Sequence, residues 1–137
     1  MKVLHLSILI LVSMFTINCS NPTCGEDITG TYNGSCESSL NNAEFEGPLL
    51  ISLSETDPSR VIIQDQTLGD GEETYEGRLN NDCNRIDVPS QSFISENQLP
   101  FAISGFFDID GNTLTGEIEI LVGVSGSFCT YTMTKEE

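Results

Sequence analysis

Two glutamates, Glu117 and Glu119, have a spacing at which paired carboxylates can do chemistry. Two residues apart on a strand, they would project from one face about 6 to 7 Å apart, near the separation used by glycosidases. They alternate with Gly116, Ile118 and Ile120, however, which is the pattern of a strand with one buried face. We therefore expect both carboxylates on a solvated outer face and predict no catalytic residue.

Two acidic segments could bind calcium. Asp70, Glu72, Glu73 and Glu76 surround a glycine-rich turn. Such charge usually keeps a loop solvated and an edge strand unpaired, with a weak calcium site as the alternative. In the segment 108–112 (DIDGN) alternate oxygens point the same way, but an EF-hand loop needs a third ligand before its glycine and flanking helices. We predict a hairpin turn at 108–112 and no metal site.

Residues for nucleophilic catalysis are nearly absent. The single histidine, His5, falls in the N-terminal segment described next, so the rest of the chain has neither a Ser-His-Asp nor a Cys-His arrangement. A Ser-Lys pair would have to use Lys135, third from the C-terminus. We therefore predict that the protein is not an enzyme and has no cofactor.

The N-terminal segment MKVLHLSILILVSMFTINC places the protein outside the cytoplasm. Lys2 precedes a mostly apolar run, residues 3–17, that is too short for a membrane span and typical of a signal peptide. In this architecture and in Cys19 the segment resembles the signal of bacterial lipoproteins, although Thr16, Ile17 and Asn18 depart from the usual residues of the cleavage box. The resemblance implies a signal peptide over residues 1–18 and lipid attachment at Cys19, with ordinary signal-peptide cleavage as the alternative.

The cysteine count agrees with an acylated Cys19. Five cysteines would leave one reactive thiol in an oxidising compartment, whereas removal of Cys19 leaves an even set. These four form no C-x-x-C pair, and the chain after the signal segment has no histidine to complete a zinc site. We expect two disulfides, and sequence alone leaves all three connectivities open for Cys24, Cys36, Cys83 and Cys129.

The charge of the chain limits its partners. From Cys19 onward it has four basic residues against 21 acidic ones, a formal charge of minus 17. Nucleic acid and anionic lipid headgroups would be repelled. The same stretch of roughly 119 residues is large enough for one domain with its own core.

The mature chain alternates with a period of two. A polar tether over residues 19–27 precedes a single domain, residues 28–137, in which no stretch has the 3.6-residue period of a helix. Expected strands are joined mostly by short turns, so we predict an all-β antiparallel meander of about eight strands forming a barrel, with a two-sheet sandwich as the alternative. The expected strands are 28–36, 44–54, 61–65, 74–79, 85–88 with a continuation through 92–95, 101–109, 114–122 and 128–134.

The segment 28–34 (ITGTYNG) resembles the opening strand of lipocalin-like domains, with Gly30 and Tyr32 at the positions of their Gly-x-Trp motif. Segments 86–91 and 103–116 are similar in order and spacing to small lipoproteins of the Bacteroidetes type. The resemblance implies an eight-stranded barrel whose first strand pairs with its last. Cys36 would then lie opposite Cys129 and Tyr32 opposite Met133, which favours a Cys36–Cys129 disulfide and leaves Cys24 to pair with Cys83.

The predicted function is binding. The leading hypothesis is an outer membrane lipoprotein that faces the periplasm or the cell surface and holds a small apolar ligand. The alternative hypotheses are a packed structural or protein-interaction module and, for the location, a secreted protein. Aromatic side chains could line a cavity or simply fill the barrel: Tyr32, Phe45, Tyr75, Phe93, Phe101, Phe106, Phe107, Phe128 and Tyr131.

Overall fold

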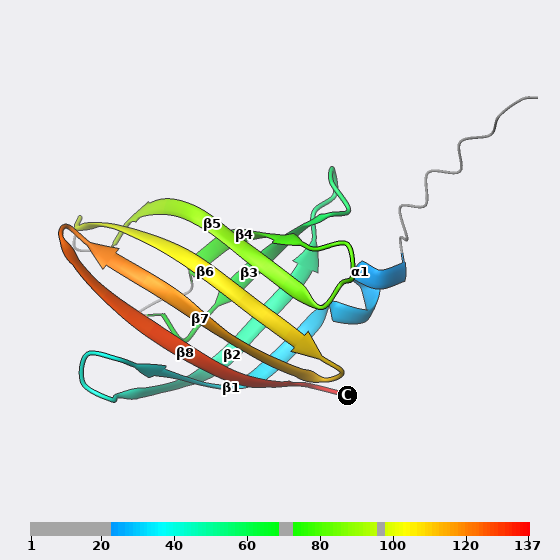
Figure 1. Ribbon diagram of the computed structural model, residues 1–137, viewed down its shortest axis with the longest axis horizontal. Helices are drawn as coiled ribbons and strands as arrows, with labels where there is room; N and C mark the ends of the chain where they lie inside the picture. Colours follow the sequence, from blue (N-terminus) through cyan, green and yellow to red (C-terminus); the bar gives the residue numbers. More distant parts are fainter. Residues whose placement is uncertain (1–22, 69–72, 96–97) are drawn as a thin grey trace, which may run out of the picture.

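The computed structural model describes residues 23–68, 73–95 and 98–137. The described chain is a short helix followed by a closed antiparallel barrel in which each strand pairs with the next and the eighth pairs with the first (Figure 1). The predicted meander barrel is therefore confirmed over the alternative sandwich. The elements are α1 (Thr23–Ile28), β1 (Gly30–Ser38), β2 (Glu44–Leu53), β3 (Arg60–Asp65), β4 (Glu73–Leu79), β5 (Arg85–Ile94), β6 (Pro100–Asp110), β7 (Thr113–Val122) and β8 (Ser125–Lys135).

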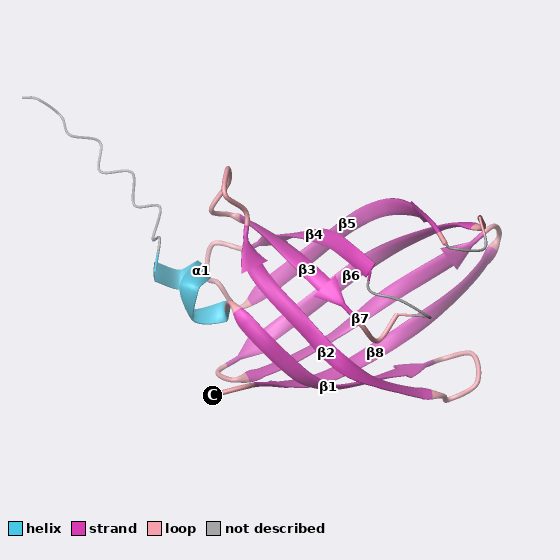
Figure 2. Ribbon diagram, turned by 180° about the vertical axis from the view of Figure 1, so that it is seen from behind, coloured by secondary structure: helices cyan, strands magenta, loops and turns pink. Residues whose placement is uncertain are grey.

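The barrel has two dissimilar ends. At one end, which we call the helix end, lie α1, the C-terminus and the turns β2–β3, β4–β5 and β6–β7 (Figure 2). The other end, the distal end, carries the turns β1–β2, β5–β6 and β7–β8. Strands β3 and β4 have six and seven residues, whereas the other strands have nine to eleven. Strand β3 therefore ends short of the distal end, and the β3–β4 connection begins there.

The segment expected as a tether contains α1 in its described part. The first strand begins at Gly30 rather than at Ile28, which is the last helical residue and is buried. The hydroxyl of Tyr32 donates a hydrogen bond of 2.8 Å to the carbonyl of Ile28, and Gly30 turns the chain from helix to strand with a φ of 135°. A helix of six residues is too short to produce a readable 3.6-residue pattern.

Strand β5 is one element where the sequence predicted a strand and a separate continuation. Its pairing with β6 shifts between Val88 and Gln91, and Pro89, which has no N–H to donate, lies in that interval. The hairpin predicted at 108–112 is present: Gly111 has a φ of 59° and lies with Asn112 between β6 and β7.

A disulfide joins the first and the last strand of the barrel. Cys36 and Cys129 form it, with their Cα atoms 5.5 Å apart. The predicted register was wrong by two residues, because Cys36 faces Tyr131 directly and Cys129 faces Ser38. The disulfide therefore joins diagonal neighbours on β1 and β8.

Cys83 is also disulfide-bonded. It lies in the β4–β5 turn, which the views place beside α1 (Figures 1 and 2). The side chain of Cys24 is outside the described residues, so its pairing with Cys83 stays a prediction. Cys19 and the signal peptide over residues 1–18 also lie outside the described residues.

Candidate functional site

A polar cluster occupies the interior of the barrel. Its centre is Asp65, the last residue of β3, whose side chain is 0% exposed. Oδ2 accepts hydrogen bonds from the hydroxyls of Tyr75 on β4 (2.8 Å) and Tyr131 on β8 (2.7 Å). Oδ1 accepts from the backbone N–H and the hydroxyl of Thr67, at 2.9 and 2.7 Å. We call Asp65, Thr67, Tyr75 and Tyr131 the interior cluster.

The interior cluster fastens opposite parts of the wall together. Four donors converge on the Asp65 carboxylate, and each of its two oxygens accepts two hydrogen bonds. Because β8 is separated from β3 by β1 and β2, the Tyr131 hydroxyl reaches across the interior. Among the described residues, no buried side-chain polar atom lacks a partner. The cluster is thus a satisfied network, the kind that fixes one packing of a core.

The two tyrosine hydroxyls are strongly biased toward their neutral form. Burial and, next, the charge of Asp65 raise the pKa of Tyr75 and of Tyr131 well above the ordinary value. Burial and the same carboxylate raise the pKa of Glu73, which pairs with Asp65 across β3 and β4. The tyrosines therefore act as hydrogen-bond donors rather than as bases near neutral pH.

The interior cluster was not predicted from the sequence. Asp65 is the last residue of the strand expected over 61–65, and Thr67 belongs to no strand or site predicted from the sequence. One signal was present: Asp65 has the same parity as Val61 and Ile63, both of which are fully buried. A carboxylate at an inward position needs partners inside the barrel.

Large side chains pack in the interior around this cluster. The rings of Phe107 and Tyr131 meet edge to face with centroids 5.2 Å apart, and Phe93 stacks on Phe101 at 5.4 Å. Tyr32 is fully buried. Three of the nine aromatics considered as cavity residues lie elsewhere: Phe45 and Phe128 are 42% exposed, and Phe106 lies under the guanidinium of Arg85.

The predicted outer face of β7 is confirmed. Glu117 is exposed and pairs with Phe106 and Thr130 of the neighbouring strands, whereas Gly116 and Ile118 are buried. Glu119 also points outward and is half-buried. The two carboxylates lie on the wall, outside the interior.

The described carboxylates of the acidic segments considered for calcium do not come together as a cluster. Glu76 forms an ion pair of 3.1 Å with Arg60, and Asp108 pairs with Arg85 at 3.0 Å. Asp70 and Glu72 lie outside the described residues. Within the part of the chain that the structure describes, no group of three or more metal-ligating side chains occurs.

Exposed apolar side chains gather at the distal end. Val124, at the tip of the β7–β8 turn, is 103% exposed, and Leu40, in the β1–β2 turn, is 75% exposed. Exposed apolar residues that are scattered singly are ordinary, whereas these residues share one end of the barrel. We call the following residues the apolar rim: Leu40, Phe45, Ile94, Leu99, Leu121, Val122, Val124 and Phe128.

The basic residues lie at the opposite end. Arg60 begins β3, Arg85 begins β5, and Lys135 ends β8, all at the helix end, and Arg78 is the last but one residue of β4. Lys135 donates a hydrogen bond of 2.6 Å to the backbone carbonyl of Asp27. In residues 23–68, 73–95 and 98–137 the distal end has carboxylates and no base.

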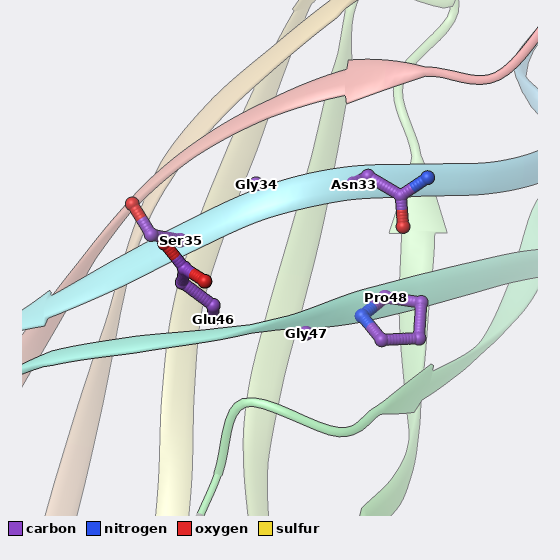
Figure 3. Close-up of a pocket in the computed structure, with 6 residues that line it drawn as sticks. All are labelled: Asn33, Gly34, Ser35, Glu46, Gly47 and Pro48. Carbon is purple, nitrogen blue, oxygen red and sulfur yellow. The ribbon is translucent and has the colours of Figure 1, made fainter.

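An open hollow of about 380 Å³ lies along β1 and β2 (Figure 3). Gly34 and Gly47 face each other directly across the two strands. The amide of Asn33 donates to Glu136 and is therefore already engaged. The lining residues are Asn33, Gly34, Ser35, Glu46, Gly47 and Pro48.

Comparisons with known proteins support the fold. A solved structure described as a redesigned β barrel superimposes with a TM-score of 0.63 at 15% identity, over 83% of this chain and 96% of that one. No protein-family model matches, and no curated protein matches. In the described part of the chain, none of the helices has the length and apolar character to cross a membrane.

Proposed function

We propose that this chain is a lipid-anchored extracytoplasmic protein whose barrel is a protein-interaction module and acts through its distal end. The observation that carries the proposal is the apolar rim, whose side chains extend from three separate turns and from the strands that these turns join. Burying a large apolar side chain against a partner contributes roughly 1.5 to 3 kcal/mol. Such residues are the usual anchors of a protein interface.

The interior favours a packed module over the carrier of a small apolar ligand. Tyr131 reaches Asp65 across the barrel, and the buried side chains of Tyr32, Phe107 and Met133 pack in the same core. A ligand at this level would have to displace hydrogen-bonded tyrosines and leave Asp65 with unsatisfied lone pairs, at a cost of several kcal/mol.

The position of α1 agrees with an anchor at Cys19. The described chain begins with α1 at the helix end, four residues after Cys19, and enters the barrel at Gly30. Two or more acyl chains on Cys19 would hold that end at the membrane, since each buried methylene contributes about 0.8 kcal/mol. The apolar rim would then face away from the membrane, toward partners in the periplasm or outside the cell.

Site-specific photo-crosslinking tests the proposed function. A photoreactive residue placed at Val124 in the full chain, in its native membrane, is expected to give a discrete protein adduct. The control position is Glu55, which is exposed in the β2–β3 turn at the helix end. Equal adducts at both positions, or none at Val124, would contradict an interface at the distal end.

A second measurement tests the anchor. Cys19→Ala is expected to release the protein from the membrane without loss of the folded barrel, because the change lies outside residues 28–137. An intact mass that begins at or after residue 20, with no acyl mass, would refute lipidation of Cys19.

A further inference from the structure

The distal end has a charge pattern that its own chain does not neutralise. Glu37 on β1 and Glu44 on β2 face each other directly and are both exposed. Like charges directly opposite on a sheet are destabilising. No ion pair joins either of them to a base among the residues that the structure describes.

The same carboxylates lie beside the apolar rim. Phe45 follows Glu44 in β2, and Leu40 lies in the turn that joins the two strands. Phe128 is bound to this turn, since its backbone N–H donates to the hydroxyl of Ser39 at 2.9 Å. Phe128 also pairs with Glu119 across β7 and β8. Glu37, Glu44, Glu119 and Phe128 therefore lie on the outer face near the β1–β2 turn, whereas Phe45, which pairs with the buried Cys36, is on the opposite face of β2 from Glu44.

We infer that the distal end docks a polypeptide segment that is amphipathic and cationic, with its apolar side chains on the rim and its lysines or arginines on Glu37, Glu44 and Glu119. This inference rests on the proposed function and specifies the chemistry of the partner. An external cation would relieve the repulsion between Glu37 and Glu44 and would be attracted from a distance by the net charge.

Other occupants of the distal end are disfavoured by the same charges. A second copy, docked end to end, would bring the carboxylates of both copies together. An anionic lipid surface would be repelled in the same way. Those carboxylates also favour a cationic segment over an apolar one without charge.

Peptide binding to the mature chain tests the inference. The probe is a synthetic amphipathic peptide of leucine and lysine, and the comparison peptide carries glutamate in place of every lysine. Fluorescence anisotropy is expected to show binding of the lysine peptide that weakens with salt, and at least about tenfold weaker binding of the glutamate peptide.

Matched variants separate docking from general attraction to an acidic protein. Glu37→Gln with Glu44→Gln should weaken binding of the lysine peptide at least about tenfold. Asp82→Asn with Asp110→Asn removes the same charge from exposed positions at the helix end and should change affinity less than about twofold. Val124→Asp adds negative charge but removes an apolar anchor, so it should also weaken binding.

Several results would overturn the inference. Equal losses in the two charge pairs, or tighter binding by Val124→Asp, would mean general electrostatic attraction. Preferred binding of the glutamate peptide, of vesicles or of a second copy would assign the surface to another occupant. If the lysine peptide fails to bind while Val124 still crosslinks to a protein, the cationic inference fails and the proposed function stands. If both fail, the proposed function fails.

Discussion

Removing the hydroxyl of Tyr131 tests whether Asp65 fastens the interior of the barrel. In Tyr131→Phe the ring and its edge contact with Phe107 remain, and the 2.7 Å hydrogen bond to Asp65 is lost. Thr67 keeps its own 2.7 Å bond to the carboxylate, and Tyr75 keeps its bond of 2.8 Å. The barrel should therefore fold, with one donor fewer on a buried anion.

The same substitution at Tyr32 is the matched control. Tyr32 is as buried as Tyr131, at 0% against 1% exposed, but its hydroxyl donates to a neutral backbone carbonyl. Hydrogen bonds to charged groups contribute about 1.5 to 3 kcal/mol and neutral ones about 0.5 to 1.5 kcal/mol. We expect the free energy of unfolding to fall by those amounts in Tyr131→Phe and Tyr32→Phe, respectively.

Urea unfolding followed by circular dichroism measures both changes, with equal m-values required for the comparison. A Tyr75→Phe variant should resemble Tyr131→Phe, and the double variant should show coupling because both hydroxyls share Oδ2. Two results would refute this reasoning: an equal loss of unfolding free energy in Tyr32→Phe and Tyr131→Phe, or a loss in the double variant that equals the sum of the two single losses. In either case the shared carboxylate would not be what stabilises Tyr75 and Tyr131.

Three further predictions concern pH and the wall. Because the pKa values of the two cluster tyrosines are raised, their contribution to stability is complete below about pH 10. It is lost as pH rises through the folded pKa, by up to about 1.4 kcal/mol per pH unit for each tyrosine. In a variant with both tyrosines changed to Phe, the free energy of unfolding obtained from urea titrations should therefore fall less steeply with pH above about pH 10. Gly34→Ala should lower the free energy of unfolding, measured by thermal denaturation, by about 3 kcal/mol or more, because its Cβ would lie 2.1 Å from a backbone oxygen. Gly126→Ala meets only side chains, at 3.2 Å or more, and should cost about 0.5 kcal/mol; equal costs would contradict this account. Replacing Cys36 and Cys129 together by serine should lower stability by about 2 to 5 kcal/mol in denaturant titrations, and an unchanged midpoint would argue against the bridge.

The strands were predictable because alternation and turn residues are local signals. The hairpin at Gly111 is fixed by residues that tolerate a positive φ, and the alternation through Ile103 and Phe107 indicated the buried face correctly. The pairing of β1 with β8 also followed from closing a meander into a barrel.

The register of β1 and β8 could not be obtained in this way. A shift of two residues leaves every side chain on the same face, so parity cannot distinguish Cys36 opposite Cys129 from Cys36 opposite Tyr131. The closure of all eight strands sets that register. Asp65 was missed for a related reason, because its partners Tyr75 and Tyr131 are 10 and 66 residues away in the sequence.

The sequence favoured some classes of function over others, but it did not indicate which surface of the protein would be used. Charge and residue types led to the prediction of a binding protein and contained no signal for a particular surface. The apolar rim draws residues from turns that are far apart in the chain, Leu40 and Val124 among them, and only the barrel topology brings them to one end.

Native mass spectrometry of the protein released from its own membrane tests the central claim most directly, because that claim is a packed barrel that acts through its surface. The account predicts a chain that begins at Cys19 with covalent acyl groups and carries no small molecule. A non-covalent ligand of a few hundred daltons, retained by the folded protein and released on unfolding, would contradict a packed interior.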